Sequence, residues 1–195
     1  MVGGLYWKTD KCSAIARQTL RFKTDTDEWQ EFGAPVVPRW NSSSCFINGF
    51  LYIICGREFE NSLNFINSIE KLRINEEGQD YEEWQLIPDV NFSKKFSARM
   101  MPLVCAIDQN EIIILGGLMY RNEMSDVFLF NTESNKLEEV SFDASSIESK
   151  FCSNYGICHI RQNQIAVLRS FANNDSHQRM EFEVIRGKQD PEEQS

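Results

Sequence analysis

The chain has few histidines and no long apolar run. Only two of its 195 residues are histidine, which is too few for a metal site that needs several imidazole ligands. The longest apolar stretch, residues 112–119, is far too short to cross a bilayer, which takes about 20 residues. Residues 1–10 lack the charged-then-apolar pattern of a signal peptide. We therefore expect a soluble chain in the cytoplasm.

The chain also lacks an excess of basic residues. It contains 29 acidic and 20 basic residues, which gives a net charge of -9 at neutral pH. Nucleic acids and anionic membranes both attract basic patches, so neither is expected as a partner. An acidic surface favours basic partners, and we expect a protein or peptide partner of that kind.

The composition predicts a folded core with free thiols. Hydrophobic residues make up 42% of the chain and charged residues 25%, so general disorder is not expected. A chain of this length does not need disulfide staples, and several of the six cysteines lie inside apolar runs such as 44–47 and 103–107. Buried thiols behave as small hydrophobic groups. We therefore expect a reducing compartment.

Short apolar runs bounded by turn residues dominate the pattern. They are rich in β-branched and aromatic side chains, and the first follows the turn signal Asn48-Gly49. Such runs are typical of buried β-strands. One short turn of helix is expected at residues 145–150. The expected strands lie at residues 50–55, 112–115, 127–130, 164–168 and 180–184.

Three landmarks recur in the same order at spacings of about 50 to 60 residues. An arginine, Arg39 or Arg99, precedes the apolar strand, and a glycine pair or its remnant ends that strand. An aromatic residue, Trp29 or Trp84, lies in the last strand. This shared order indicates an internal repeat. The glycine positions are Gly3-Gly4, Cys55-Gly56, Gly116-Gly117 and Arg169-Ser170.

This order resembles the kelch repeat, whose unit of about 50 residues forms one four-stranded blade of a β-propeller. The resemblance implies an all-β, kelch-type β-propeller segment of about four blades, built from four-stranded antiparallel sheets. The segments that carry it are Pro38-Arg39, 48–56 and Glu83-Trp84 in the second repeat, and Arg99, 112–117 and 126–131 in the third.

The repeats depart from the family pattern in places. Cys55 replaces a glycine, Arg169-Ser170 replaces the whole pair, and Leu137 stands where a tryptophan is expected. The first repeat begins at its glycine pair, so we expect an incomplete first blade. We also expect the chain to self-associate or to belong to a longer propeller. The predicted propeller domain, 1–187, consists of repeats at 1–33, 34–88, 89–143 and 144–187, and a polar tail follows at 188–195.

The resemblance gives the recurring residues structural roles. The strand before each glycine pair is expected to be buried on both faces. The glycines supply positive φ and let backbones approach closely. Trp29 and Trp84 are expected to fill the space between neighbouring blades.

No set of residues has the pattern of a metal site or a catalytic site. Cys152, Cys158 and His159 fit no common zinc spacing. Cys158 and His159 are adjacent on a predicted strand and point to opposite faces, so they cannot form a nucleophile pair. The acidic residues in 75–83 lack the spacing of a calcium loop. We expect no metal and no cofactor.

Loops on one face of such a propeller converge on a rigid scaffold and suit binding. We therefore predict a non-enzymatic protein-interaction module or scaffold. The alternative is a catalytic kelch-like propeller that holds a small anionic, sugar-acid-like substrate with Arg39, Arg99 and Glu58, in a deep pocket of converging ionisable groups. Arg, Trp, Tyr and Met are enriched at interaction hot spots. The candidate partner-contact residues are Arg39, Trp40, Asn41, Arg57, Arg99, Met100, Tyr120, Asn154 and Tyr155.

Overall fold

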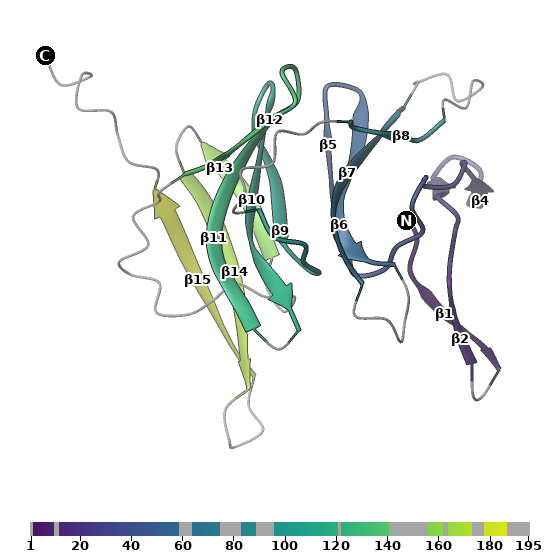
Figure 1. Ribbon diagram of the computed structural model, residues 1–195, viewed down its shortest axis with the longest axis horizontal. Coiled ribbons are helices and arrows are strands. Elements are labelled where there is room, and N and C mark those ends of the chain that lie inside the picture. Colours follow the sequence, from purple (N-terminus) through teal and green to yellow (C-terminus); the bar gives the residue numbers. More distant parts are fainter. Residues whose placement is uncertain are drawn as a thin grey trace, which may run out of the picture. The chain divides into compact units, whose positions relative to one another are not determined.

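The computed structural model is built from antiparallel β-sheets (Figure 1). Its described part contains fifteen strands and no helix, and therefore no helix that could cross a membrane. The helical turn predicted at 145–150 lies outside the described residues, as does the tail at 188–195. The structure describes residues 2–9, 12–58, 64–74, 83–88, 96–120, 122–140, 156–161, 164–172 and 178–186.

The chain divides into two compact units. The first comprises Met1–Asp89 with Ser97–Met101, and the second comprises Val90–Phe96 with Pro102–Ser195. The first unit contains two hairpins and one four-stranded sheet in the order β5-β6-β7-β8. Its strands are β1 (Leu5–Thr9), β2 (Cys12–Ile15), β3 (Leu20–Lys23), β4 (Glu28–Glu31), β5 (Ser43–Ile47), β6 (Phe50–Arg57), β7 (Phe65–Arg73) and β8 (Gln85–Leu86).

The second unit contains a four-stranded sheet in the order β12-β11-β10-β9 and a sheet of three described strands, β13-β14-β15. All five strands predicted from the apolar runs are present, as parts of β6, β10, β11, β14 and β15. The strands of this unit are β9 (Leu103–Asp108), β10 (Glu111–Met119), β11 (Asn122–Asn131), β12 (Lys136–Glu139), β13 (Gly156–Arg161), β14 (Gln164–Ala172) and β15 (Gln178–Arg186).

The predicted turn at Asn48-Gly49 joins β5 to β6. Ile47 pairs with Phe50 in the register, so the loop between them has two residues. Asn48 has φ of 50° and Gly49 has φ of 78°. Two consecutive positive φ angles match the twist of a two-residue hairpin, and Asn-Gly is the sequence that tolerates them best.

Each described glycine pair, or its remnant, introduces a bulge in the sheet. The pairing of β6 with β7 shifts between Ile54 and Gly56, and that of β10 with β11 shifts between Leu115 and Gly117. The φ angles repeat as well: 60° and 112° at Cys55-Gly56, and 51° and 109° at Gly116-Gly117. At Arg169-Ser170, where both glycines are missing, β14 pairs with β15 without a shift. In these sheets the bulge is therefore present where the pair keeps at least one glycine.

The strand ahead of each of these bulges is buried on both faces, as predicted. Ile53, Ile54 and Cys55 in β6 are fully buried, and so are residues 112–115 in β10. In the second unit, Ile113 and Leu115 pack in a core with Ile165 and Val167 from β14. A strand covered on both faces has no polar side to present to water, which explains the continuous apolar run.

Trp84 lies in the core of the first unit. It is 5% exposed and packs with Phe32, Ile53 and Leu72. Its indole Nε1 donates a hydrogen bond of 2.9 Å to Oγ1 of Thr19, so the polar atom of the buried ring is satisfied. The side chain thus links residues of the first and second predicted repeats.

Trp29 does not have the buried position predicted for it. It is 61% exposed and packs only partly against Phe22, with the ring centroids 5.2 Å apart. Phe22 pairs with Trp29 in the register, just as Phe130 pairs with Leu137, which is 3% exposed. The prediction was wrong because the repeat pattern gives only the position of Trp29 within its sheet. It does not tell which residues cover that face of the sheet.

We expect Gly56→Ala to lower the free energy of unfolding by about 3 kcal/mol. The φ of 112° is strained for any side chain, and an added Cβ would lie 2.9 Å from the backbone oxygen of Trp40. Gly49→Ala is the control, because its Cβ would meet nothing within 4 Å and only a backbone strain of about 1 kcal/mol remains. Urea unfolding followed by tryptophan fluorescence measures both. Equal losses would contradict the close approach at Gly56.

Candidate functional site

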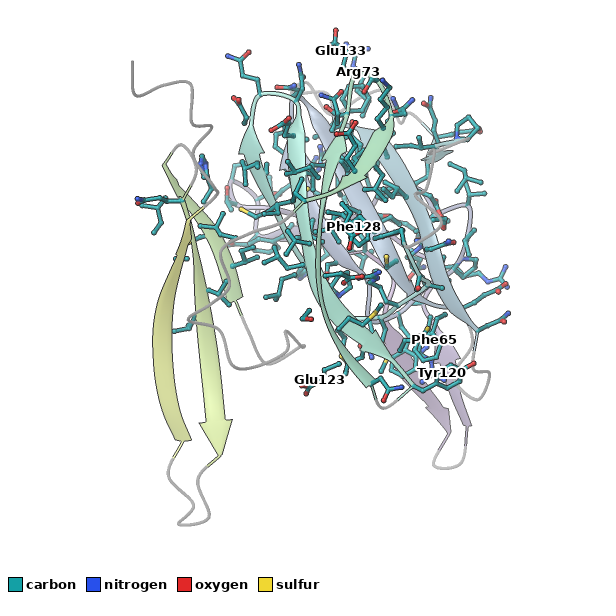
Figure 2. All side chains as sticks on the ribbon, turned by 60° about the vertical axis from the view of Figure 1, so that its left-hand side comes forward. Phe65, Arg73, Tyr120, Glu123, Phe128 and Glu133 are labelled. Atoms are coloured by element: carbon teal, nitrogen blue, oxygen red, sulfur yellow. The ribbon has the colours of Figure 1, made fainter. Side chains whose placement is uncertain are left out.

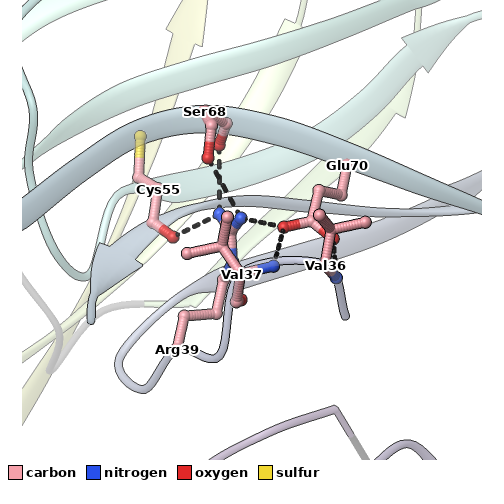
Figure 3. A network of polar contacts seen from close by, with 6 residues as sticks. All are labelled: Val36, Val37, Arg39, Cys55, Ser68 and Glu70. Carbon is pink, nitrogen blue, oxygen red and sulfur yellow. Dashed lines mark hydrogen bonds and ion pairs between the residues drawn. The ribbon is translucent and has the colours of Figure 1, made fainter. Parts of the chain in front are cut away.

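Arg39 lies inside the first unit, where all five of its N–H groups are used (Figure 3). Nε donates to the Val37 carbonyl at 3.2 Å. Nη1 donates to the Cys55 carbonyl at 3.0 Å and to the Ser68 carbonyl at 3.1 Å. Nη2 donates to Oγ of Ser68 at 3.0 Å and to a carboxylate oxygen of Glu70. The side chain has no donor left for a ligand.

Glu70 is the buried counter-ion of Arg39. Both side chains are fully buried and form a salt bridge. Besides the guanidinium, the carboxylate accepts hydrogen bonds from the backbone N–H groups of Val36 at 2.7 Å and Val37 at 3.0 Å. Burial lowers the pKa of Arg39 from its ordinary value, and the charge of Glu70 opposes that shift. The pair therefore fixes residues 36–39 against β7.

Arg99 repeats part of this geometry. It is fully buried, and its Nε donates to the Ser97 carbonyl at 2.9 Å, two residues back, as Nε of Arg39 does to Val37. The backbone carbonyl of each arginine also accepts from the second glycine of the preceding repeat. Gly4 donates to Arg39 at 3.2 Å, and Gly56 donates to Arg99 at 2.8 Å. This contact explains why arginine and glycine recur together.

Arg57 lies between two aromatic rings beside these buried groups. Its guanidinium carbon is 5.1 Å from the ring centroid of Trp40 and 5.3 Å from that of Phe65, which begins β7 (Figure 2). Trp40 and Arg57 also exchange backbone hydrogen bonds of 3.0 and 2.9 Å. All three side chains are partly exposed. They form a cation–π stack that a partner could reach.

Two left-handed residues border the stack. Asn41 and Met101 each have φ of 53° and follow the two arginine segments at the same spacing. The Met101 N–H donates to the Asn41 carbonyl at 2.7 Å, and Nδ2 of Asn41 lies 3.8 Å from the sulfur of Met100. A methionine in this backbone region is uncommon and carries strain of order 1 kcal/mol. The segments are thus held in a costly conformation beside accessible side chains.

The structure brings together six of the nine predicted contact residues, all in the first unit. Arg39 and Arg99 are interior, whereas Trp40, Asn41, Arg57 and Met100 are partly exposed. We call the last four, with Phe65, the stack cluster.

The other three predicted residues are not in the first unit. Tyr120 lies at the turn between β10 and β11 in the second unit and is 54% exposed (Figure 2). Asn154 and Tyr155 lie outside the described residues.

Sequence reasoning did not single out Glu70, Ser68 or Phe65. Glu70 gave only a weak signal, because Ile69 precedes this carboxylate in its strand but Lys71 follows it. A charge in such a place is buried only with a partner. Phe65 gave no signal, since its ring matters only through its distance from Arg57.

The first unit also contains a cavity of about 360 Å³, lined mainly by apolar residues of β3, β4 and β6. No residue of the stack cluster lines it, and Arg21 is its one ionisable lining residue. Among the described residues no three potential ligands gather around a metal position. Cys158 is exposed, and Cys105 has a thiol pKa that burial raises, against a hydrogen bond with the backbone of His159. Cys152 lies outside the described residues.

The chain matches no protein-family model, and no curated protein matches it either. What relates its segments is geometry within the chain. Cys55-Gly56 and Gly116-Gly117 form the same bulge, and Arg39 and Arg99 make the same contact two residues back. The repeat is thus inferred only from similarities between segments of this chain.

We expect Glu70→Gln to lower the free energy of unfolding by about 3 kcal/mol, because it leaves the buried charge of Arg39 without a counter-ion. Glu58→Gln is the matched control. Glu58 is partly exposed and accepts from Asn64 at 3.1 Å, so its loss is expected to stay below about 0.5 kcal/mol. Urea unfolding measures both. Similar losses in the two variants would show that the buried pair contributes little.

Proposed function

We propose that the chain is a kelch-type β-propeller segment that acts as a protein-interaction module. Two four-stranded antiparallel sheets, each with a bulge ending an apolar strand, support the blade interpretation. The contact from each glycine to the next arginine supports a serial stacking of repeats. Both features concern the scaffold, and the function depends on what the scaffold presents.

The stack of Trp40, Arg57 and Phe65 is the observation that carries the proposal. Trp and Arg are the residue types most enriched at binding hot spots. The two rings hold the Arg57 guanidinium in place, so little side-chain entropy would be lost when a partner binds. Arg39, the residue before Trp40, donates all five of its N–H groups to hydrogen bonds inside the unit and so holds this segment in place.

Trp40 adds an unused hydrogen-bond donor. Its Nε1 is buried and has no hydrogen-bond partner among the described residues. Such a donor costs about 1 to 3 kcal/mol when it stays unpaired. Because this nitrogen has almost no exposed surface, a carbonyl oxygen of a bound chain can remove that cost only if the indole turns outward on binding. A peptide backbone offers such a carbonyl at every residue. This favours a protein or peptide partner.

The chemistry favours a partner with both basic and carbonyl groups. The whole chain carries a net charge of -9, which attracts basic segments over distance. Glu58, next to the stack, is partly exposed and can receive a lysine or arginine. The Arg57 guanidinium already stacks on the rings of Trp40 and Phe65. Its role in the proposed site is therefore to hold the rings in position and not to bind an anion.

The catalytic alternative has less support. It places an anionic substrate on Arg39 and Arg99, but both are fully buried and Arg39 uses all five donors internally. The cavity of the first unit has Arg21 as its single ionisable group. An arginine alone supplies no general base for a substrate in that cavity.

We expect Trp40→Ala to abolish capture of specific partners by the tagged chain, measured by affinity purification with quantitative mass spectrometry. The indole supplies both the aromatic face and the unpaired donor, and loss of a hot spot typically weakens binding by 2 kcal/mol or more, about 30-fold. Arg57→Ala should remove the same proteins, because the stack collapses without its cation.

Phe46→Ala is the control for this experiment. Phe46 is a 58% exposed aromatic residue of β5 outside the stack cluster, so its variant should keep the partner set of the wild type. Proteins lost equally from all three variants would be non-specific. If no protein depended on Trp40 while a small metabolite co-purified with the wild type, the interaction-module proposal would be wrong.

A further inference from the structure

An exposed aromatic pair lies on the outer face of the hairpin β3–β4. Phe22 is 42% exposed and Trp29 is 61% exposed, and they pair directly in the register. Directly opposed residues on neighbouring strands share a face. Arg21 and Lys23 alternate with them and lie on the other face, where Arg21 stacks on Phe32 at 5.0 Å. We call Phe22 and Trp29 the β3–β4 face.

The same pair is buried in the next two predicted repeats. Leu72 and Trp84 pack in one core, one residue beyond the Lys71–Gln85 pair of β7 and β8, and are 0% and 5% exposed. In β11 and β12, Phe130 and Leu137 are 0% and 3% exposed. In the second repeat, residues of the hairpin before it provide the cover, namely Thr19 and Phe32. The expected cover for Trp29 is therefore also the face of a β-sheet.

A second exposed apolar face lies on the hairpin β13–β14. Gly156 pairs with Leu168 and Cys158 pairs with Ala166, so Cys158, Leu168 and Ala166, which is 1% exposed, share a side. Cys158 is exposed and Leu168 is 40% exposed. Ile160, 47% exposed, follows on the same strand. We call Cys158 and Leu168 the β13–β14 face.

We propose that the β3–β4 face of one chain docks on the β13–β14 face of a second copy. The internal cover of Trp84 is the precedent for sheet-on-sheet burial of this pair. Because the two faces differ, the contact is heterologous. Two copies can form a closed dimer with two such contacts, or more copies can form a ring or an open chain. This inference concerns surfaces outside the stack cluster and is independent of the proposed function.

Charge supports a second copy as the occupant. The segment 18–32 holds two basic and four acidic residues, whereas the segment 156–186 holds four basic and three acidic residues. By sequence, the first segment thus carries a net charge of -2 and the second a net charge of +1, in a chain with a net charge of -9. Opposite local charge steers two faces together and disfavours pairing of the β3–β4 face with itself.

The test is sedimentation velocity of the full chain over about 1 to 100 μM, the range in which a micromolar contact is seen. We expect the wild type to associate as its concentration rises. Trp29→Lys and Leu168→Lys should each be monomeric, because each blocks one of the two faces. A 1:1 mixture of these two variants should form a heterodimer, since each still carries the face that the other has lost.

Val36→Lys is the matched control. Val36 is 55% exposed and lies on neither face, so its variant should associate as the wild type does. Far-UV circular dichroism and the melting temperature verify that each variant is folded, and Cys158→Lys replaces Leu168→Lys if the latter unfolds. A monomeric wild type, a mixture that stays monomeric, or loss of association in Val36→Lys would each overturn the proposal.

Discussion

The buried guanidinium of Arg39 is the interaction on which the first unit depends. It joins the segment before β5 to two paired strands, at the bulge of β6 at Cys55 and at the middle of β7 at Ser68 and Glu70. An arginine can do this because its five donors diverge in one plane. The cost of burying the charge is met only if every donor is used, so the positions of all three pieces are constrained together.

The glycines follow from the same constraint. The Gly56 N–H reaches the Arg99 carbonyl at 2.8 Å, and a Cβ there would clash with the Trp40 backbone. Cys55 has a side chain at φ of 60°, a left-handed conformation that costs a non-glycine residue of order 1 kcal/mol. The bulge thus keeps its shape with one glycine and disappears only when both are replaced, as in β14.

The sequence was sufficient for the five predicted strands and for the positive φ angles at the glycines, because these depend on local pattern. Apolar runs, Asn48-Gly49 and the glycine pairs each act on their own backbone, and all have the predicted form. The exposure of individual side chains was harder to predict from the sequence. Arg39 and Arg57 are the same residue type, yet one is buried and the other lies between two rings, since Glu70 and Phe65 come from distant positions in the chain. The structure thus brings several of the predicted residues together, but the burial of Arg39 and the two ring partners of Arg57 were not predicted.

Trp29 and Trp84 show what a repeat position leaves open. Both rings occupy equivalent places in their sheets, but one is buried against Thr19 and Phe32 while the other faces outward. Their difference comes from the neighbouring sheet and not from their own strands. In a stack of repeats, each apolar face is buried only where a neighbouring repeat covers it. The exposure of Trp29 is thus the observation behind the proposed contact between two copies, in which a second sheet face covers that ring.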